Sequence, residues 1–269
     1  MQTVLSAGLS LITVIAMPIV AQAQSPYELF IQGAAYYGAG NYVQAEETLQ
    51  QALQADVDGN HTFAIYHYLA NALREQGRYE EAEVAYQAAL NDNSDGDTHF
   101  YTDFGINLAA QERHEEAEAA FRQALSLEAP LTAGLSYPAL STDGAYALAH
   151  LHLGTALYNQ GRYPEAELAY RDSIRLNPED VRSYIYLGSV LFHQDQEAEA
   201  EATFQAVRNS YPDNARIYII LGDIYQFHGY VEEAIAHYQQ ALSLDPQNAE
   251  AQDKLTEAES LQLQPGSIE

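Results

Sequence analysis

The chain contains neither cysteine nor tryptophan, and its only two methionines are Met1 and Met17. The lack of cysteine excludes disulfides, thiol nucleophiles, cysteine-based zinc sites and a lipid anchor attached through cysteine. Basic residues are scarce, because 11 Lys and Arg stand against 38 Asp and Glu, for a formal net charge of −27. Such a chain repels phosphate backbones and anionic lipids, so we expect no nucleic-acid partner, and no membrane contact unless an N-terminal leader stays attached.

Catalytic patterns are missing as well. The sequence has no G-x-S-x-G, no H-E-x-x-H, no P-loop and no G-x-G-x-x-G, the motifs that would point to an enzyme or a nucleotide cofactor. His99 and Asp103 share one predicted helix face, with His67 and His152 on flanking helices, but a metal site of this kind needs a second close pair of ligands. We therefore predict no enzyme, no cofactor and no metal site.

The N-terminal stretch carries no charged side chain before Glu28 and is largely apolar from Leu9 to Met17. Pro18 and the Ala21-Gln22-Ala23 pattern that follow are typical of the cleavage site of a secretory leader. We predict a signal peptide over residues 1–23 and an exported protein in the periplasm, or one that is lumenal or secreted. The leader has no Lys or Arg at its start and is long enough to span a bilayer, so an N-terminal membrane anchor is the alternative.

The sequence is rich in an internal repeat. A short phrase recurs in four places: Gly40-Asn41-Tyr42, Gly77-Arg78-Tyr79, Gly161-Arg162-Tyr163 and Gly229-Tyr230. Aligned in blocks of 34 residues, six units start at Pro26, Phe63, Thr98, Ala147, Val181 and Ala215. Self-similarity at a period of this length predicts a solenoid of stacked repeats.

The blocks agree position by position. The eighth residue is always small: Gly33, Ala70, Gly105, Gly154, Gly188 and Gly222. The twentieth is always alanine: Ala45, Ala82, Ala117, Ala166, Ala200 and Ala234. The twenty-fourth is large: Leu49, Tyr86, Phe121, Tyr170, Phe204 and Tyr238. Small residues facing a large one let two helices approach closely, so we predict that each block is a helical hairpin.

Six such blocks in register resemble the tetratricopeptide repeat (TPR) family. The resemblance implies an all-α protein, a right-handed superhelix of about six helix-turn-helix repeats, each made of an A helix and a B helix. We place this domain at residues 26–263, with an insertion at 132–146, a capping helix at 249–261 and a disordered tail at 264–269. The third and fifth blocks depart from the pattern, with Glu112 and Asp195 at the turn position that is glycine elsewhere.

In the TPR family the A helices line a concave groove, and the resemblance implies that block positions 2, 5, 6, 9, 12 and 13 face it. These positions carry aromatic, His, Asn and Arg side chains, which are typical anchors of protein interfaces. The candidate groove residues are His67, Tyr68, Asn71, His99, Asp103, His152, Tyr158, Arg182, Tyr186, Arg216 and Phe227. The competing interpretation is that tyrosine is common throughout this chain and covers helix surfaces indifferently.

Two further interpretations of charged residues stay open. Arg182 and Arg216 occupy the second position of adjacent blocks, so they form either a small anion-binding pair or a pair that neutralises nearby acid. The glutamates that open the B helices favour the positive end of the helix dipole, and we interpret them as solvated faces.

We therefore predict an exported TPR scaffold that binds a protein or peptide partner through its groove. One alternative is a self-assembling structural or spacer protein, in which copies associate through their end repeats or through the insertion at 132–146. Another alternative is a module that binds a small ligand or a glycan with the groove aromatics.

Overall fold

A computed structural model describes residues 24–90, 96–127 and 142–263. The predicted leader (1–23), the predicted tail (264–269) and most of the predicted insertion lie outside these ranges. Within them the chain forms thirteen helices and no strand. The helices are α1 (Pro26–Gly38), α2 (Tyr42–Ala55), α3 (Thr62–Glu75), α4 (Tyr79–Leu90), α5 (Thr98–Ala110), α6 (His114–Ser126), α7 (Thr142–Asn159), α8 (Tyr163–Leu176), α9 (Val181–His193), α10 (Glu197–Ser210), α11 (Ala215–Phe227), α12 (Val231–Leu244) and α13 (Ala249–Gln262).

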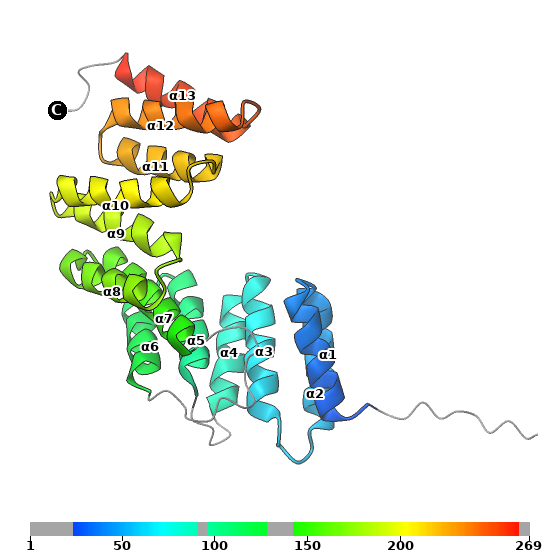
Figure 1. Cartoon of the computed structure of the whole chain (residues 1–269). Helices are drawn as coiled ribbons and strands as arrows, with labels where there is room; N and C mark the ends of the chain where they lie inside the picture. Colours follow the sequence, from blue (N-terminus) through cyan, green and yellow to red (C-terminus); the bar gives the residue numbers. More distant parts are fainter. Residues whose placement is uncertain (1–23, 91–95, 128–141, 264–269) are drawn as a thin grey trace, which may run out of the picture.

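The first twelve helices form six successive hairpins, and α13 packs against α12 at the end of the stack (Figure 1). In Figure 1 the hairpins of α1 to α6 stand nearly upright, whereas those from α9 onward lie across them, so the stack turns around α7 and α8. This arrangement confirms the predicted all-α superhelix of six helix-turn-helix repeats with a C-terminal capping helix. Odd-numbered helices up to α11 are the A helices, and even-numbered ones are the B helices.

One boundary differs from the repeat alignment. Helix α7 begins at Thr142 rather than at Ala147, so the last residues of the predicted 132–146 insertion are helical. Ala145 and Ala149 of this helix are buried in the core, and Asp143 lies in its first turn, where a negative charge favours the helix dipole. Burial and dipole together extend the helix beyond the repeat period.

The small and large positions of each repeat interlock as the sequence predicts. The alanine at the twentieth position is fully buried in all six repeats. A Cβ atom added to Gly188 would lie 2.2 Å from Cε1 of Phe204, and one added to Gly222 would lie 2.4 Å from Cε1 of Tyr238. In these two repeats the A-helix backbone therefore rests directly on the aromatic ring of its own B helix, and a larger residue at the eighth position has no room.

All six hairpin turns share one backbone conformation. The four glycines at the turn position have φ between 74° and 83°. Glu112 and Asp195 take the same left-handed conformation, with φ of 61° and 58°. A side chain disfavours this conformation, so the fold imposes the turn on both residues.

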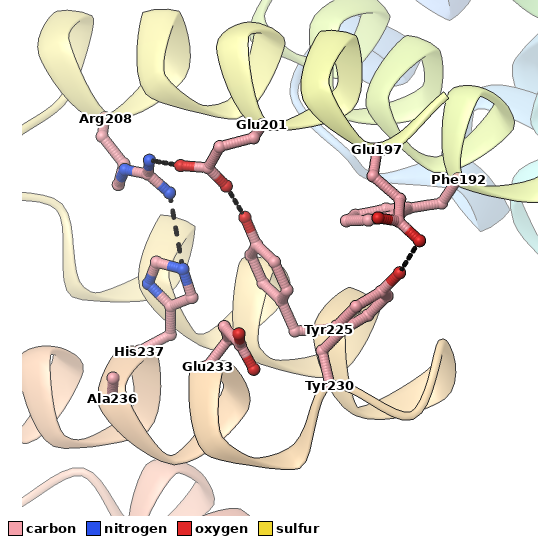
Figure 2. A pocket seen from close by; sticks show the side chains of 9 residues that line it. All are labelled: Phe192, Glu197, Glu201, Arg208, Tyr225, Tyr230, Glu233, Ala236 and His237. Atoms are coloured by element: carbon pink, nitrogen blue, oxygen red, sulfur yellow. Dashed lines mark hydrogen bonds and ion pairs between the residues drawn. The ribbon is translucent and has the colours of Figure 1, made fainter. Parts of the chain in front are cut away.

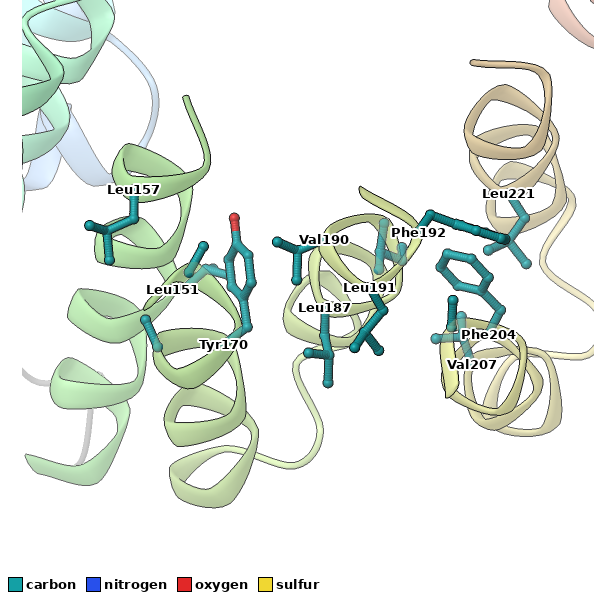
Figure 3. Close-up of a cluster of buried hydrophobic side chains, with 14 of the residues drawn as sticks. Leu151, Leu157, Tyr170, Leu187, Val190, Leu191, Phe192, Phe204, Val207 and Leu221 are labelled. Atoms are coloured by element: carbon teal, nitrogen blue, oxygen red, sulfur yellow. The ribbon is translucent and has the colours of Figure 1, made fainter. Parts of the chain in front are cut away.

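The buried core of the described residues has two main clusters. The N-terminal cluster runs from Leu29 to Phe100, and the C-terminal cluster runs from Leu108 to Ala258. Figure 3 shows how the second cluster continues from helix to helix, with Tyr170 beside α7 and Phe204 beside α11. The division falls within α5, where partly buried Phe104 packs against both clusters. None of the helices in the described part of the chain combines the length and the apolar character that crossing a membrane requires.

Candidate binding site on the A-helix face

All the predicted groove residues lie on A helices, and we call the surface that α1, α3, α5, α7, α9 and α11 form the A-helix face. The structure separates these residues into three groups. One group is tied together in a buried polar network on α3 and α5. A second lines a pocket on α7, α9 and α11, and the rest lie outside both.

The first group centres on Asp103, and we call it the Asp103 network. Asp103 Oδ2 lies 2.9 Å from His67 Nε2 and accepts a hydrogen bond of 2.9 Å from Asn71 Nδ2. Arg74 Nη1 donates to Asp103 Oδ1 at 3.3 Å, and Tyr86 Oη donates to Asn71 Oδ1 at 2.5 Å. The network joins α3 to α5 where the core divides.

Burial by itself would raise the pKa of Asp103, but His67, Arg74 and Asn71 together lower it well below its usual range. Asp103 is therefore ionised at neutral pH, and these partners stabilise the charge of its partly buried carboxylate. The side chains of His67 and Asn71 are only 1% and 3% exposed. These two predicted groove residues are therefore buried and bonded to Asp103, and they are not available to a ligand. Asp103 lies on the next A helix, and the spacing of residues along one helix does not reveal such a contact.

The second group lines a pocket of about 320 Å³, which we call the A-helix pocket. Its lining residues come from three consecutive A helices and one B helix: Thr155, Tyr158, Asn159, Tyr170, Ile185, Tyr186, Ser189, Ile220, Asp223 and Ile224. Tyr158 and Tyr186 are the candidate groove residues among them, and Asn159 and Asp223 also stand at predicted groove positions. Tyr186 is 40% exposed, and its ring lies 5.7 Å from that of Tyr170.

The polar groups of the A-helix pocket are already positioned by neighbours. Tyr158 Oη lies 2.6 Å from His193 Nε2, and Tyr170 Oη donates to Thr155 Oγ1 at 3.3 Å. Asp223 Oδ1 lies 2.8 Å from both Lys254 Nζ and Tyr238 Oη, so the charge of its carboxylate is balanced. Burial raises the pKa of the Tyr158 hydroxyl, which therefore stays protonated. The pocket is thus an apolar and aromatic cavity with hydroxyl groups, suited to an apolar or aromatic side chain.

Phe227 lies at the edge of this region. It is 73% exposed, and its ring is 5.9 Å from that of His193, which itself contacts Tyr158 at 5.2 Å. An aromatic side chain this exposed in the folded chain is available for contact with another molecule. Tyr158, His193 and Phe227 therefore continue the aromatic surface outward from the pocket.

The remaining predicted residues lie apart from the pocket lining. Tyr68 packs edge-on against Phe30 and Tyr37, with ring centroids 5.4 and 5.8 Å apart. His99 is half-buried on α5. His152 stacks on Phe121 at 5.8 Å, and its burial together with the charge of Arg182 lowers its pKa to about 4. His152 is therefore neutral at pH 7 and part of the packing.

The proposed arginine pair is only partly available for an anion. Arg182 Nη2 lies 2.7 Å from Asp180 Oδ2, so a carboxylate of its own chain already holds this guanidinium. Arg216 is exposed at the start of α11. The structure thus favours neutralisation of nearby acid for Arg182.

Several pocket residues stand at predicted groove positions yet escaped the prediction. Ile185, Ser189, Thr155 and Ile220 occupy positions five, nine, nine and six of their blocks. Aliphatic side chains at such positions cannot be told from core residues in one sequence. The available signal was the coincidence of small hydroxyl residues at the ninth position in two adjacent repeats.

The sequence matches one known protein family over most of its length. Residues 29–93, 98–130, 151–215 and 215–248 each match a family model described as tetratricopeptide repeat. No curated protein sequence matches the chain significantly.

Solved structures share the fold at low sequence identity. PilW, described as a widely conserved type IV pilus biogenesis factor, has a TM-score of 0.69 at 20% identity, over 86% of this chain and 98% of its own. YrrB, described as a TPR protein with an unusual peptide-binding site, has a TM-score of 0.52 at 22% identity, over 77% of this chain and 97% of its own. A chain of the APC/C hetero-tetramer Cut9-Hcn1 has a TM-score of 0.64 at 14% identity over 87% of this chain, which spans only 42% of that chain's length.

Proposed function

The chain belongs to the tetratricopeptide repeat family, and from this premise we propose that it is an exported scaffold that binds a protein or peptide segment in the concave groove formed by its A-helix face. The observation that carries the proposal is the A-helix pocket on α7, α9 and α11. Export rests on the predicted leader over residues 1–23.

The pocket chemistry defines the segment that fits. Its isoleucine and tyrosine walls favour an apolar or aromatic side chain, because such contacts remove apolar surface from water. Its hydroxyl groups offer hydrogen bonds to a polar tip or to a backbone amide. The net charge of −27 of the whole chain disfavours an acidic segment. We therefore propose a neutral or basic segment with one large apolar or aromatic anchor.

The first test is a selection of random peptides displayed on phage against the purified chain. We expect enriched peptides to share an aromatic or large aliphatic residue, and Tyr186→Ala to weaken their binding about tenfold, as loss of an interface anchor does. Tyr27→Ala is the matched control, because Tyr27 is an exposed tyrosine of an A helix outside the pocket. Because Tyr27 lies on the same A-helix face, equal losses from both substitutions would contradict the A-helix pocket as the anchor site.

Export has its own test. N-terminal sequencing of the protein purified from its native host should begin at Gln24, next to the predicted cleavage pattern. An intact N-terminus recovered from the membrane fraction would support the anchor instead.

A small ligand or glycan is the second candidate occupant. The pocket volume of about 320 Å³ is within the range of small-molecule sites. A thermal-shift screen against sugars and aromatic metabolites distinguishes this occupant from a peptide. The self-assembling spacer stays a prediction, and light scattering over a range of concentrations measures it.

A further inference from the structure

On the B-helix side, arginines join three pairs of neighbouring repeats in the same way. Arg113, at the sixteenth position of the third repeat, places Nη1 2.5 Å from Glu83 of the preceding repeat and Nε 2.7 Å from Glu116 of its own repeat. Glu83 is at the twenty-first position and Glu116 at the nineteenth. The same bridge, which we call the arginine fork, is made by Arg78 with Glu46 and Glu81, and by Arg162 with Glu118 and Glu165.

The junction between the fourth and fifth repeats has the same bridge, but a different arginine forms it. The fifth repeat has Gln196 at the sixteenth position. Arg171 of α8 contacts Glu167 at 2.8 Å and Glu199 at 2.6 Å, and these are the twenty-first-position and nineteenth-position glutamates of that junction. A guanidinium therefore lies between the same two carboxylate positions in the first four junctions.

The junction between the fifth and sixth repeats lacks this bridge. The sixth repeat has Tyr230 at the sixteenth position, and the two glutamates are Glu201 and Glu233. Arg208 reaches Glu201 from within α10. In the described part of the chain, which includes every Lys and Arg, no basic side chain forms an ion pair with Glu233.

A pocket of about 460 Å³ lies where the missing fork would be, and we call it the B-helix pocket. Figure 2 shows that Glu201 faces it from α10 and Glu233 from α12, with Tyr225 between them. Tyr230 and Phe192 supply further aromatic surface. Aromatic rings attract a cation through their negative faces, so both the carboxylates and the rings favour a positive group.

The electrostatics of the B-helix pocket are those of an incomplete ion-pair site. Partial burial would raise the pKa of Glu201, but hydrogen bonds from Tyr225 and Arg208 lower it, so this carboxylate is ionised. Burial and the charge of Arg208 lower the pKa of His237 to about 4, so His237 adds no positive charge at pH 7. Arg208 is then the one cation of the lining against Glu197, Glu201 and Glu233.

We propose that the B-helix pocket binds an arginine side chain of a partner protein, whose guanidinium takes the place that the fork arginine has in the earlier repeats. Guanidinium is favoured because its planar donors engage two carboxylates at once. The net charge of −27 attracts a basic partner to the chain. The B-helix pocket shares no lining residue with the A-helix pocket, so it is a second binding site and goes beyond the groove.

The test is an NMR titration of the full chain with N-acetyl-L-arginine amide. We expect saturable shifts of backbone amides confined to α10, α12, the turn at Tyr230 and the residues around Phe192 and Tyr225. N-acetyl-L-citrulline amide has the same shape without the charge, and we expect it to bind at least about tenfold more weakly, the usual difference between charged and neutral hydrogen bonds.

Two variants and one control decide the outcome. Tyr230→Arg supplies the fork arginine within the chain and should abolish the saturable shifts, and Glu233→Gln should weaken binding about tenfold. Glu232→Gln removes the same charge from the adjacent residue outside the pocket and should leave binding unchanged. The proposal is overturned if citrulline binds as well as arginine, if Tyr230→Arg binds like the natural chain, or if Glu232→Gln weakens binding as much as Glu233→Gln.

Discussion

The two halves of the A-helix face place different chemistry at the same positions of the repeat. In the second repeat, positions five and nine are His67 and Asn71, and both contact Asp103 at position six of the third repeat. In the fifth repeat, the equivalent positions are Ile185 and Ser189, and position six of the next repeat is Ile220; all three line the A-helix pocket.

Position twelve extends the contrast. In the second repeat it is Arg74, which contacts Asp103, whereas in the fourth repeat it is Tyr158, which lines the pocket. The backbone of the two regions is the same hairpin. Polarity and size at four positions therefore decide whether neighbouring A helices are tied together by charge or leave a cavity for a ligand.

The largest expected effect comes from breaking the Asp103 network. Asp103→Ala leaves Arg74 and the buried His67 without their carboxylate, so we expect a loss of about 3–5 kcal/mol in the free energy of unfolding. Tyr186→Ala changes the same position of the fifth repeat, where the side chain is half exposed, and should cost about 1 kcal/mol. Urea titrations of both variants measure the contrast, and equal losses would show that the two regions do not differ in this way.

The next largest effect is that acid pH should destabilise the C-terminal half before the N-terminal half. His152 and His237 in the C-terminal half have pKa values of about 4, below the ordinary 6.5. Between these values the unfolded chain binds more protons than the folded chain, so stability falls as pH drops from 6.5 towards 4, by up to about 3 kcal/mol for each histidine. Asp103, whose pKa is lowered, loses its contribution only below the ordinary aspartate pKa of 3.8.

Thermal melts between pH 7 and 4.5 check this order. His152→Gln should flatten the pH dependence of Tm, because the group that takes up the proton is gone. Hydrogen exchange should show opening at α7 to α12 before α3 to α5 as the pH falls. Simultaneous opening of both regions at pH 5 would contradict the interpretation that His152 and His237 make the C-terminal half the more acid-sensitive one.

A smaller effect tests whether the fifth repeat is packed more tightly than the second. The second repeat accommodates Ala70 beside buried Tyr86, whereas a Cβ at Gly188 would meet the ring of Phe204 at 2.2 Å. Gly188→Ala should therefore cost about 1–3 kcal/mol despite the better helix propensity of alanine. Gly38→Ala is the control, because nothing lies within 4 Å of its added Cβ, and it should be neutral or stabilising in urea titrations.

The smallest expected effects have the opposite sign. Glu112→Gly and Asp195→Gly relieve residues held at positive φ, so each should stabilise the chain by about 0.5–1 kcal/mol. The gain should be larger for Glu112, because aspartate tolerates this conformation better. Differential scanning calorimetry measures both, and a loss of stability would mean that the side chains hold the turns by contacts of their own.

Much of the fold could be predicted from the sequence, because the pattern of small and large residues recurs in all six repeats. In the fifth repeat this pattern consists of Gly188, Ala200 and Phe204. The division of the core at α5 did not follow from it. The apolar periodicity continues through Phe100, Phe104 and Leu108, and only the contacts between helices show that two clusters meet there.

The site was predicted at the level of helices rather than of side chains. Tyr158 and Tyr186 line the pocket, as predicted for groove residues. His67 and Asn71 instead contact Asp103 on another helix. Likewise, the glutamates that begin the B helices were interpreted as solvated faces, but Glu46, one of them, binds Arg78 of the next repeat. A single sequence gives the face of a helix and not its partner across a junction.

The break in the core within α5 has a mechanical consequence. When tension is applied between α1 and α13, the load passes through each repeat in series, and stacked repeats yield in cooperative units rather than as one body. Two clusters that meet at one partly buried ring define two such units. A single molecule pulled from its ends should therefore extend in two main steps, one for each side of Phe104.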